Sequence, residues 1–267
     1  MKKSIPLLFL LLSISFTAFS QRTDRVTLPG SSIEIYSGSF YSPDEKPALD
    51  SAFTSRTFLA LYPDGNTYRI TPVRPVVRAY EHMGEFTEIN GEQMHTEAFS
   101  LYVDWDSLRT NPVPSSIFSN YAKPEFLITG LTQYNANPIP EQEMYYINLT
   151  PANRWSYEVN GRQYEIRAEA DRFDAGAWGD LQVDHYTLYL RKNETEQPIL
   201  AFDHREDTVP QFLFIGDIDG DGAADLIIDD ADTFEEDKIV LYLSTAARPG
   251  ELVGVAAFEG RFRGTMR

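Results

Sequence analysis

Short segments of alternating apolar and polar residues dominate the chain, and the turns between them are rich in Gly, Pro and Asn. The turn Pro63-Asp64-Gly65-Asn66 lies between two such segments, and it predicts a β-hairpin because its residues accept or pre-set turn dihedrals. The strongest hairpin signal is Asn160-Gly161, between residues 155–159 and 162–168, because both turn residues accept a positive φ. A further hairpin is expected around Asn90-Gly91.

More strand-like segments follow along the chain, and helical periodicity is nearly absent. Many short strands with regular turns are typical of an all-β protein, so we expect antiparallel sheets that form a sandwich or a barrel-like structure. The further segments expected to be strands are residues 32–36, 181–190, 198–202, 239–243 and 252–258.

A polar segment with two prolines and two asparagines, residues 132–142, suggests a boundary within the chain. We therefore expect an N-terminal β-rich region, 21–135, and a C-terminal β-rich region, 136–267. A single continuous sandwich is the alternative, because the length suits either one large β domain or two smaller ones.

Residues 1–20 have the pattern of a secretory signal peptide. Lys2 and Lys3 precede a short apolar run, and small residues come before the expected cleavage after Ser20. With no Cys there is neither a lipid-attachment cysteine nor a disulfide framework. We expect a secreted or periplasmic protein without a membrane span, since no later segment approaches the length that a span requires.

The charge balance excludes some partners. With 23 Lys and Arg against 40 Asp and Glu, the formal net charge is −17. Nucleic-acid backbones and anionic membrane surfaces would be repelled by this charge. Acidity is also common in soluble exported proteins, so the charge by itself identifies no ligand.

The candidate chemistry is concentrated in one loop near the C-terminus. Carboxylates stand at its positions 1, 3, 5 and 9, and Gly222 at position 6 permits a sharp bend. This spacing lets the side chains converge on one cation, and Ca²⁺ prefers about 6–8 oxygen ligands. The expected ligands are Asp217, Asp219, Asp221 and Asp225 through their side chains and Ala223 through its carbonyl, with water completing the shell.

The residues around the loop identify its type. Position 12 is Ile228, which excludes the helix-flanked calcium hand with its bidentate Glu. Residues 211–215 and 226–228 are short and apolar, as strands are. A strand–loop–strand with D-x-D-x-D-G-x-x-D resembles the calcium loops of FG-GAP and VCBS-type repeats, and this resemblance implies Ca²⁺ ligation by the same five residues. It covers only residues 212–230, and a propeller would need several such loops. The alternative is an acidic hairpin turn without an ion.

A wider segment, comprising residues 214–229, 241–244 and 250–253, resembles the C-terminal part of uncharacterised secreted bacterial β-proteins. That resemblance implies a class and no activity.

Two polar clusters outside the loop have alternative interpretations. In the acidic segment 229–237, Asp229 or Asp232 could complete the ion's shell or hold a second weak ion, but a solvated acidic loop is the simpler interpretation. His204, beside Asp203 and Glu206, is expected in an exposed loop.

Three functional hypotheses follow. The first is a calcium-binding β-protein without catalytic activity, in which the ion is structural. The second is a calcium-dependent module that binds a glycan or an envelope protein through aromatic residues such as Trp105 and Trp178, although large aromatics also fill β-sandwich cores. The third is a hydrolase with paired carboxylates, for example Asp104 or Asp106. A thiol mechanism is excluded because the chain has no Cys, and no G-x-S-x-G motif is present.

Overall fold

The computed structural model shows an all-β protein built from antiparallel sheets, which confirms the predicted fold class. No sheet among the described residues closes into a barrel, and the arrangement is that of a layered sandwich. The structure describes residues 25–27, 32–37, 40–41, 55–82, 88–89, 92–93, 96–104, 121–122, 126–142, 147–175, 181–233 and 236–262. The predicted signal peptide, the Asn90-Gly91 turn, Trp105, Asp106 and Trp178 lie outside these residues.

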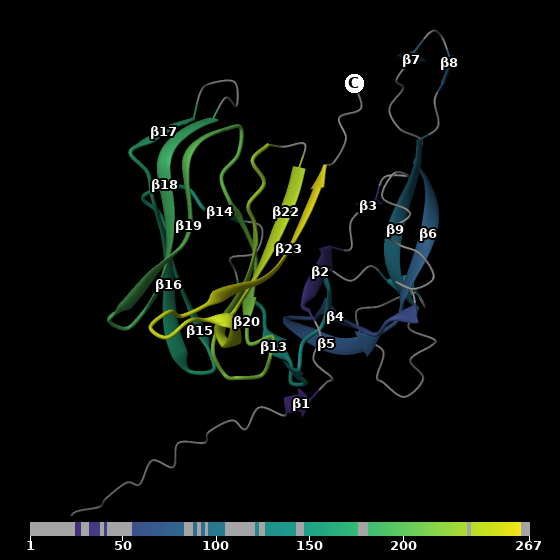
Figure 1. The fold of residues 1–267 in the computed structure, drawn as a ribbon, viewed down its shortest axis with the longest axis horizontal. Coiled ribbons are helices and arrows are strands. Elements are labelled where there is room, and N and C mark those ends of the chain that lie inside the picture. The colour runs from purple at the N-terminus through teal and green to yellow at the C-terminus, as the bar shows by residue number, and fades with distance from the viewer. Residues whose placement is uncertain are drawn as a thin grey trace, which may run out of the picture.

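Three five-stranded sheets make up the body of the structure (Figure 1). The first, called here the N-terminal sheet, has the order β13-β5-β4-β11-β2. Its strands are β2 (Glu34–Ser37), β4 (Phe58–Asp64), β5 (Thr67–Val73), β11 (Phe126–Thr129) and β13 (Ile139–Pro140).

The middle sheet has the order β14-β20-β21-β22-β23. Its strands are β14 (Ile147–Asn148), β20 (Gln211–Gly216), β21 (Asp225–Asp229), β22 (Glu236–Leu243) and β23 (Gly254–Phe262). A single 3₁₀ turn, η3 (Ser244–Ala246), follows β22.

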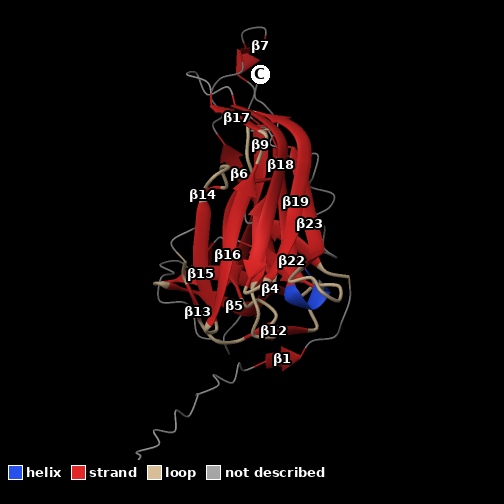
Figure 2. Ribbon diagram, turned by 90° about the vertical axis from the view of Figure 1, so that its left-hand side faces the viewer, coloured by secondary structure: helices blue, strands red, loops and turns tan. Residues whose placement is uncertain are grey.

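The third sheet, called here the hairpin sheet, is built from strands that follow one another along the chain. They are β15 (Arg154–Val159), β16 (Arg162–Glu169), β17 (Arg172–Ala175), β18 (Leu181–Lys192) and β19 (Thr195–Glu206). The long strands β16, β18 and β19 run side by side in Figure 2.

Smaller ladders complete the described structure. A sheet next to the N-terminal sheet in Figure 1 contains β3 (Phe40–Tyr41), β6 (Pro75–His82), β9 (Thr96–Asp104) and β10 (Tyr121–Ala122). Two-stranded ladders join β1 (Arg25–Thr27) to β12 (Gln133–Asn135), and β7 (Glu88–Ile89) to β8 (Glu92–Gln93).

The central strands β20 and β21 of the middle sheet are buried on both faces. One hydrophobic cluster joins this sheet to the hairpin sheet, and a second joins it to the N-terminal sheet. Every residue of β21 is buried, as are the last five residues of β20. This two-sided burial explains why residues 212–215 and 226–228 are continuously apolar rather than alternating.

A β-bulge in β20 distributes its side chains between the two clusters. The register with β21 shifts between Phe212 and Phe214. Phe212 and Ile215 consequently pack towards the hairpin sheet, whereas Leu213 and Phe214 pack towards the N-terminal sheet. One extra residue on a bulged strand produces this break in strict alternation.

Of the three predicted hairpins, the two whose turns lie within the described residues are confirmed. Residues 65 and 66 connect β4 to β5, and Asn160-Gly161 connects β15 to β16. Asn160 and Gly161 have φ values of 50° and 74°, which suit a two-residue hairpin turn.

Segment 133–140, where the sequence predicts a domain boundary, is engaged with both sides of that boundary. Ile139 pairs with Tyr68 of the N-terminal sheet, and the backbone N–H of Asn135 donates to the carbonyl of Ile218, 2.9 Å away. The division at residue 135 stays a prediction.

His204 lies within strand β19, so the loop predicted for it is wrong. Its Nδ1 lies 2.6 Å from Asp184 Oδ1 on the neighbouring strand, and its Nε2 lies 3.3 Å from Glu206 Oε1. The hydrogen bonds to these carboxylates raise the pKa of His204, and the bond to His204 lowers the pKa of Asp184.

This pair predicts a pH-dependent contribution to stability. Because the pKa of His204 is raised, the contribution is present below the ordinary pKa of about 6.5 and is lost as pH rises through the folded-state pKa. In an NMR titration, we expect the His204 midpoint to lie above 6.5 and to fall in Asp184→Asn. An unchanged midpoint in that variant would show that Asp184 does not hold the proton on His204.

Candidate metal centre

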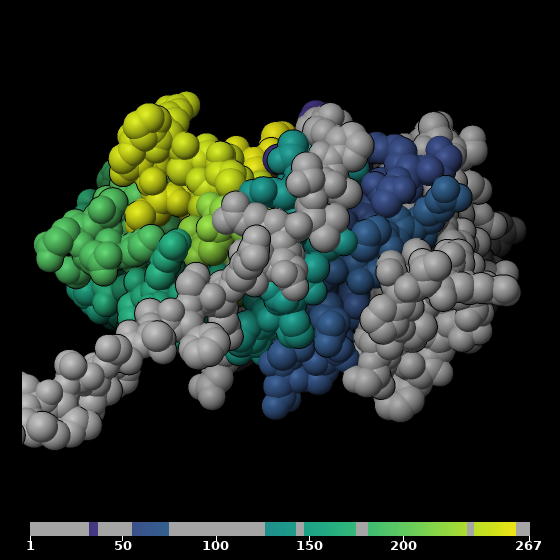
Figure 3. Space-filling view, turned by 90° about the horizontal axis from the view of Figure 1, so that it is seen from below, coloured from purple at the N-terminus to yellow at the C-terminus, as the bar shows by residue number. Residues whose placement is uncertain are grey.

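The predicted calcium loop connects β20 to β21, and Gly216 pairs with Asp225 at its base. Gly220 and Gly222 have φ values of 77° and 84°, which L side chains rarely adopt, so both glycines permit the loop's turns. Gly216 is required by close packing, because a Cβ there would lie 2.5 Å from Ile139 Cγ2. The base of the loop therefore packs against β13 of the N-terminal sheet. Figure 3, a view from below, shows the green and yellow residues of the C-terminal half beside the blue residues of the N-terminal sheet.

Three of the predicted ligands converge. Asp217, Asp219 and Asp225 each offer a carboxylate oxygen, and these oxygens lie within 4.8 Å of one another. All three residues are buried, with exposed fractions of 1%, 1% and 0%. Three buried carboxylates at this separation repel one another unless protons or a cation compensate their charge.

In Asp225 and Asp219, both carboxylate oxygens accept hydrogen bonds from the protein. Asp225 Oδ2 accepts hydrogen bonds from the backbone N–H groups of Ile218 and Asp219, and its Oδ1 accepts one from the N–H of Ser244. Asp219 Oδ1 accepts from the N–H of Asp221, and its Oδ2 accepts from the Thr245 hydroxyl. The site therefore includes η3 as well as the loop.

Asp217 is different, because only one of its oxygens has a partner. Its Oδ2 accepts from the N–H of Gly222, at 3.0 Å, and from Asn160 Nδ2, at 2.9 Å. Its Oδ1 is buried and has no hydrogen-bond partner within the part of the chain that the structure describes. A buried acceptor without a partner costs about 1–3 kcal/mol, and a cation bound at this oxygen would remove that cost.

The pKa values of the cluster reflect its burial and its charge. Desolvation, with the nearby charges of Asp221 and Asp219, raises the pKa of Asp217 to about 6. Desolvation and the charge of Asp219 also raise the pKa of Asp225 well above its usual range. A bound cation would reverse this effect by favouring the ionised carboxylates.

Of the other two predicted ligands, Asp221 and Ala223, Asp221 is not one of the three converging carboxylates. Asp221 is partly exposed; its Oδ1 accepts from the N–H of Ala223 and its Oδ2 accepts from the Ser244 hydroxyl, 2.7 Å away. Their roles as ligands stay predictions.

Sequence reasoning missed three residues that contact these carboxylates: Asn160, Ser244 and Thr245. The sequence predicts only a turn at Asn160. Ser244 and Thr245 follow β22 and belong to no recognised metal-binding motif.

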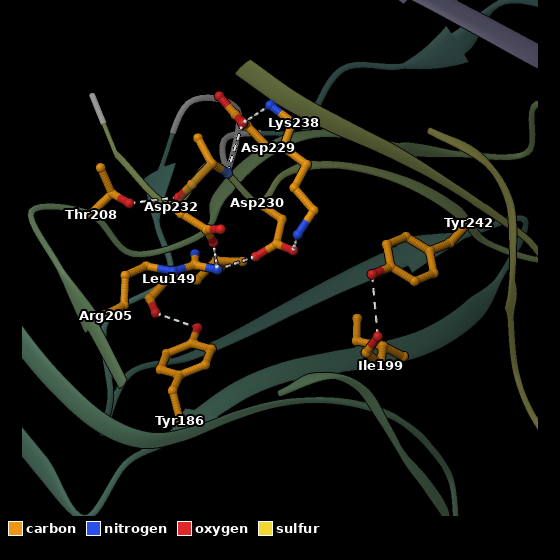
Figure 4. Close-up of polar contacts among 11 residues, drawn as sticks. Leu149, Tyr186, Ile199, Arg205, Thr208, Asp229, Asp230, Asp232, Lys238 and Tyr242 are labelled. Carbon is orange, nitrogen blue, oxygen red and sulfur yellow. Dashed lines mark hydrogen bonds and ion pairs between the residues drawn. The ribbon is translucent and has the colours of Figure 1, made fainter. Parts of the chain in front are cut away.

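The second acidic cluster faces cations of the protein (Figure 4). Arg205 of β19 donates through Nη2 to Asp230, at 2.9 Å, and to Asp232, at 2.6 Å, and Lys238 Nζ lies 2.9 Å from the other oxygen of Asp230. Asp229 Oδ1 accepts from the backbone N–H groups of Ala231 and Lys238.

These contacts bear on both interpretations of the acidic segment. Among the described residues, neither Asp229 nor Asp232 belongs to the group of three carboxylates. Asp229 is at the other end of β21 from Asp225, about 13 Å away along the strand, and Asp232 is bonded by Arg205. Arg205 and Lys238 neutralise the carboxylates of Asp230 and Asp232. Arg205 lies 25 or more residues earlier in the sequence, whereas Lys238 directly follows the acidic segment.

The fold and the site together define a class: a layered all-β protein with a buried aspartate group that could hold a metal ion. Comparison with family models, with curated proteins and with solved structures yields no match to this chain. Across the described residues, no helix is long and apolar enough to cross a membrane.

Proposed function

We propose that this chain is an exported protein that binds one Ca²⁺ at the Asp217, Asp219 and Asp225 carboxylates, and that the ion is structural. The observation that carries the proposal is Asp217 Oδ1, a buried oxygen in a group of three buried carboxylates that has no partner among the described residues. The D-x-D-x-D-G-x-x-D spacing supports the same conclusion.

The donor set favours a hard cation. The polar side chains around the site present carboxylate, hydroxyl and amide groups, and neither His nor Cys belongs to the described carboxylate group. Oxygen donors suit Ca²⁺ and Mg²⁺, whereas Zn²⁺ prefers nitrogen and sulfur ligands. Between the first two, Ca²⁺ is favoured because it tolerates irregular geometry and binds several carboxylates directly.

A structural role follows from where the loop is anchored. Asp225 and Asp219 accept hydrogen bonds from η3, which follows β22 of the middle sheet. Asp217 accepts one from Asn160 of the hairpin sheet, and the Ile218 carbonyl accepts one from the N–H of Asn135. The carboxylates are almost fully buried, which does not suit a catalytic metal because such a metal needs an open coordination position. An ion that binds only the folded state stabilises it by mass action.

Calorimetric titration of chelator-treated protein tests this proposal. At pH 7.5 we expect one Ca²⁺ per chain and much weaker binding of Mg²⁺, which dehydrates reluctantly. The absence of Ca²⁺ binding, with an unchanged melting temperature, would make the loop an acidic hairpin turn. Equal affinity for Mg²⁺ would leave the site intact and contradict its assignment to Ca²⁺.

A further inference from the structure

The side chain that holds Asp217 from outside the loop belongs to a different sheet. Asn160, in the turn between β15 and β16, donates its amide to Asp217 Oδ2 across 57 residues of sequence. With the N–H of Gly222, this bond occupies Oδ2, whereas Oδ1 has no partner in the described part of the chain. Hydrogen bonds to the non-coordinating atom of a ligand orient the ligand and tune its affinity for a metal.

We propose that Asn160 is a positioning residue of the metal centre, so that Ca²⁺ binding is coupled to the docking of the β15–β16 hairpin on the middle sheet. This inference rests on the proposed function, since it concerns the affinity of the same site. It adds a residue that the D-x-D-x-D-G-x-x-D pattern does not contain.

A second contact joins the same hairpin to the same loop. The backbone N–H of Ala224, next to Asp225, donates to the Tyr164 hydroxyl at 3.2 Å. Tyr164 stacks on Tyr157, with ring centroids 5.7 Å apart, and Tyr157 in turn contacts the ring of Phe212 in β20. The hairpin therefore contacts the loop at both ends and the strand that leads into it.

This arrangement has a thermodynamic consequence. If Asn160 orients Asp217 for the ion, then the bound ion must stabilise the position of Asn160 by the same free energy, because coupling between two sites is reciprocal. Ca²⁺ should accordingly suppress local opening of a hairpin that supplies no ligand from its own strands.

The turn chemistry supplies a clean substitution. Asn160 has φ 50°, a conformation that glycine adopts without strain, so Asn160→Gly removes the amide and keeps the turn. The matched control is Asn193→Gly in the turn between β18 and β19. Asn193 has φ 53° and lies in the same sheet, and no contact with the loop is described for its side chain.

Titration calorimetry with Ca²⁺ on the two variants and the parent chain is the test. We expect Asn160→Gly to weaken Ca²⁺ binding by about 10-fold to 100-fold, the usual effect of losing a group that orients a metal ligand. Asn193→Gly should leave the affinity within about twofold. In chelator, Asn160→Gly should melt at the lower temperature of the two, because it alone loses a hydrogen bond to a buried carboxylate.

Hydrogen exchange supplies a readout that a purely structural role would not move. In the parent chain, Ca²⁺ should slow exchange of the amides of residues 157–164, and in Asn160→Gly this slowing should be largely lost at saturating Ca²⁺. If the parent chain binds Ca²⁺ and Asn160→Gly binds it equally well, with the same slowing, the coupling is refuted while the metal site stands. If the parent chain binds no Ca²⁺, the proposed function itself fails.

Discussion

Asp217→Asn is expected to melt at a higher temperature than the parent chain in chelator and at a lower temperature in saturating Ca²⁺. Without the ion, the substitution removes one charge from the group of three carboxylates, where desolvation and the charges of Asp221 and Asp219 already disfavour ionisation of Asp217. The amide oxygen of the substituted side chain can still accept the hydrogen bonds from Gly222 and Asn160. With the ion, the variant lacks a charged ligand, and the charge count governs Ca²⁺ affinity.

The size of the effect follows from mass action. At a free Ca²⁺ concentration of about 100 times Kd, the ion stabilises the parent chain by about 2.7 kcal/mol, and a 100-fold weaker variant gains only about 0.4 kcal/mol. For a chain of this size, about 2.7 kcal/mol corresponds to a rise in Tm of about 5–10 °C. The melts should be made at pH 7.5, above the pKa of about 6, so that Asp217 is ionised.

The matched control for this prediction is Asp203→Asn, which changes an exposed carboxylate on β19. It should retain the full Ca²⁺-dependent rise in Tm. If Asp217→Asn had the lower Tm in chelator as well as in Ca²⁺, the predicted reversal between the two conditions would be contradicted. Asp217 would then stabilise the fold even without an ion.

Arg205→Met is expected to cause a large, calcium-independent loss of stability. The Arg205 side chain is only 5% exposed and donates to both Asp230 and Asp232. Removing one partner from a buried ion pair typically costs about 3–5 kcal/mol, because the remaining carboxylate is left uncompensated. Arg205 Nη1, however, is buried without a partner among the described residues, and losing this donor favours the variant. We therefore expect the lower end of that range, about 3 kcal/mol.

Urea denaturation with and without Ca²⁺ measures this loss. Met is chosen because it keeps an apolar side chain beside the ring of Phe202, over which the guanidinium of Arg205 lies at 4.0 Å. Lys238→Met is the comparison: that side chain is 41% exposed and bonds the same Asp230, so its loss should cost no more than about 1 kcal/mol. Asp230→Asn should recover part of the stability lost in Arg205→Met. A cost below about 1 kcal/mol for Arg205→Met would show that the pair is not needed to compensate Asp230.

Much of the fold was predictable because local patterns determine strands and tight turns. The Asn160-Gly161 hairpin follows from two residues that accept positive φ, and the structure has that turn. The stacking of the sheets was harder to predict from the sequence, because the continuous burial of β20 and β21 depends on sheets formed by distant segments. The sequence also misplaced His204, because a run of charged residues on an exposed sheet face has the same composition as a loop.

For the candidate site, the sequence by itself determined the spacing of the acidic residues, the flanking strands and the glycines that let the loop turn. These are properties of neighbouring residues, and short-range geometry is enough to specify them. Only the tertiary structure decided that Asp217, Asp219 and Asp225 are buried together, that Asn160 holds Asp217, and that Arg205 neutralises the other acidic cluster. The contacts made by Asn160 and Arg205 join residues 25 to 57 positions apart, and the burial of the three aspartates likewise exists because the sheets pack their apolar faces together.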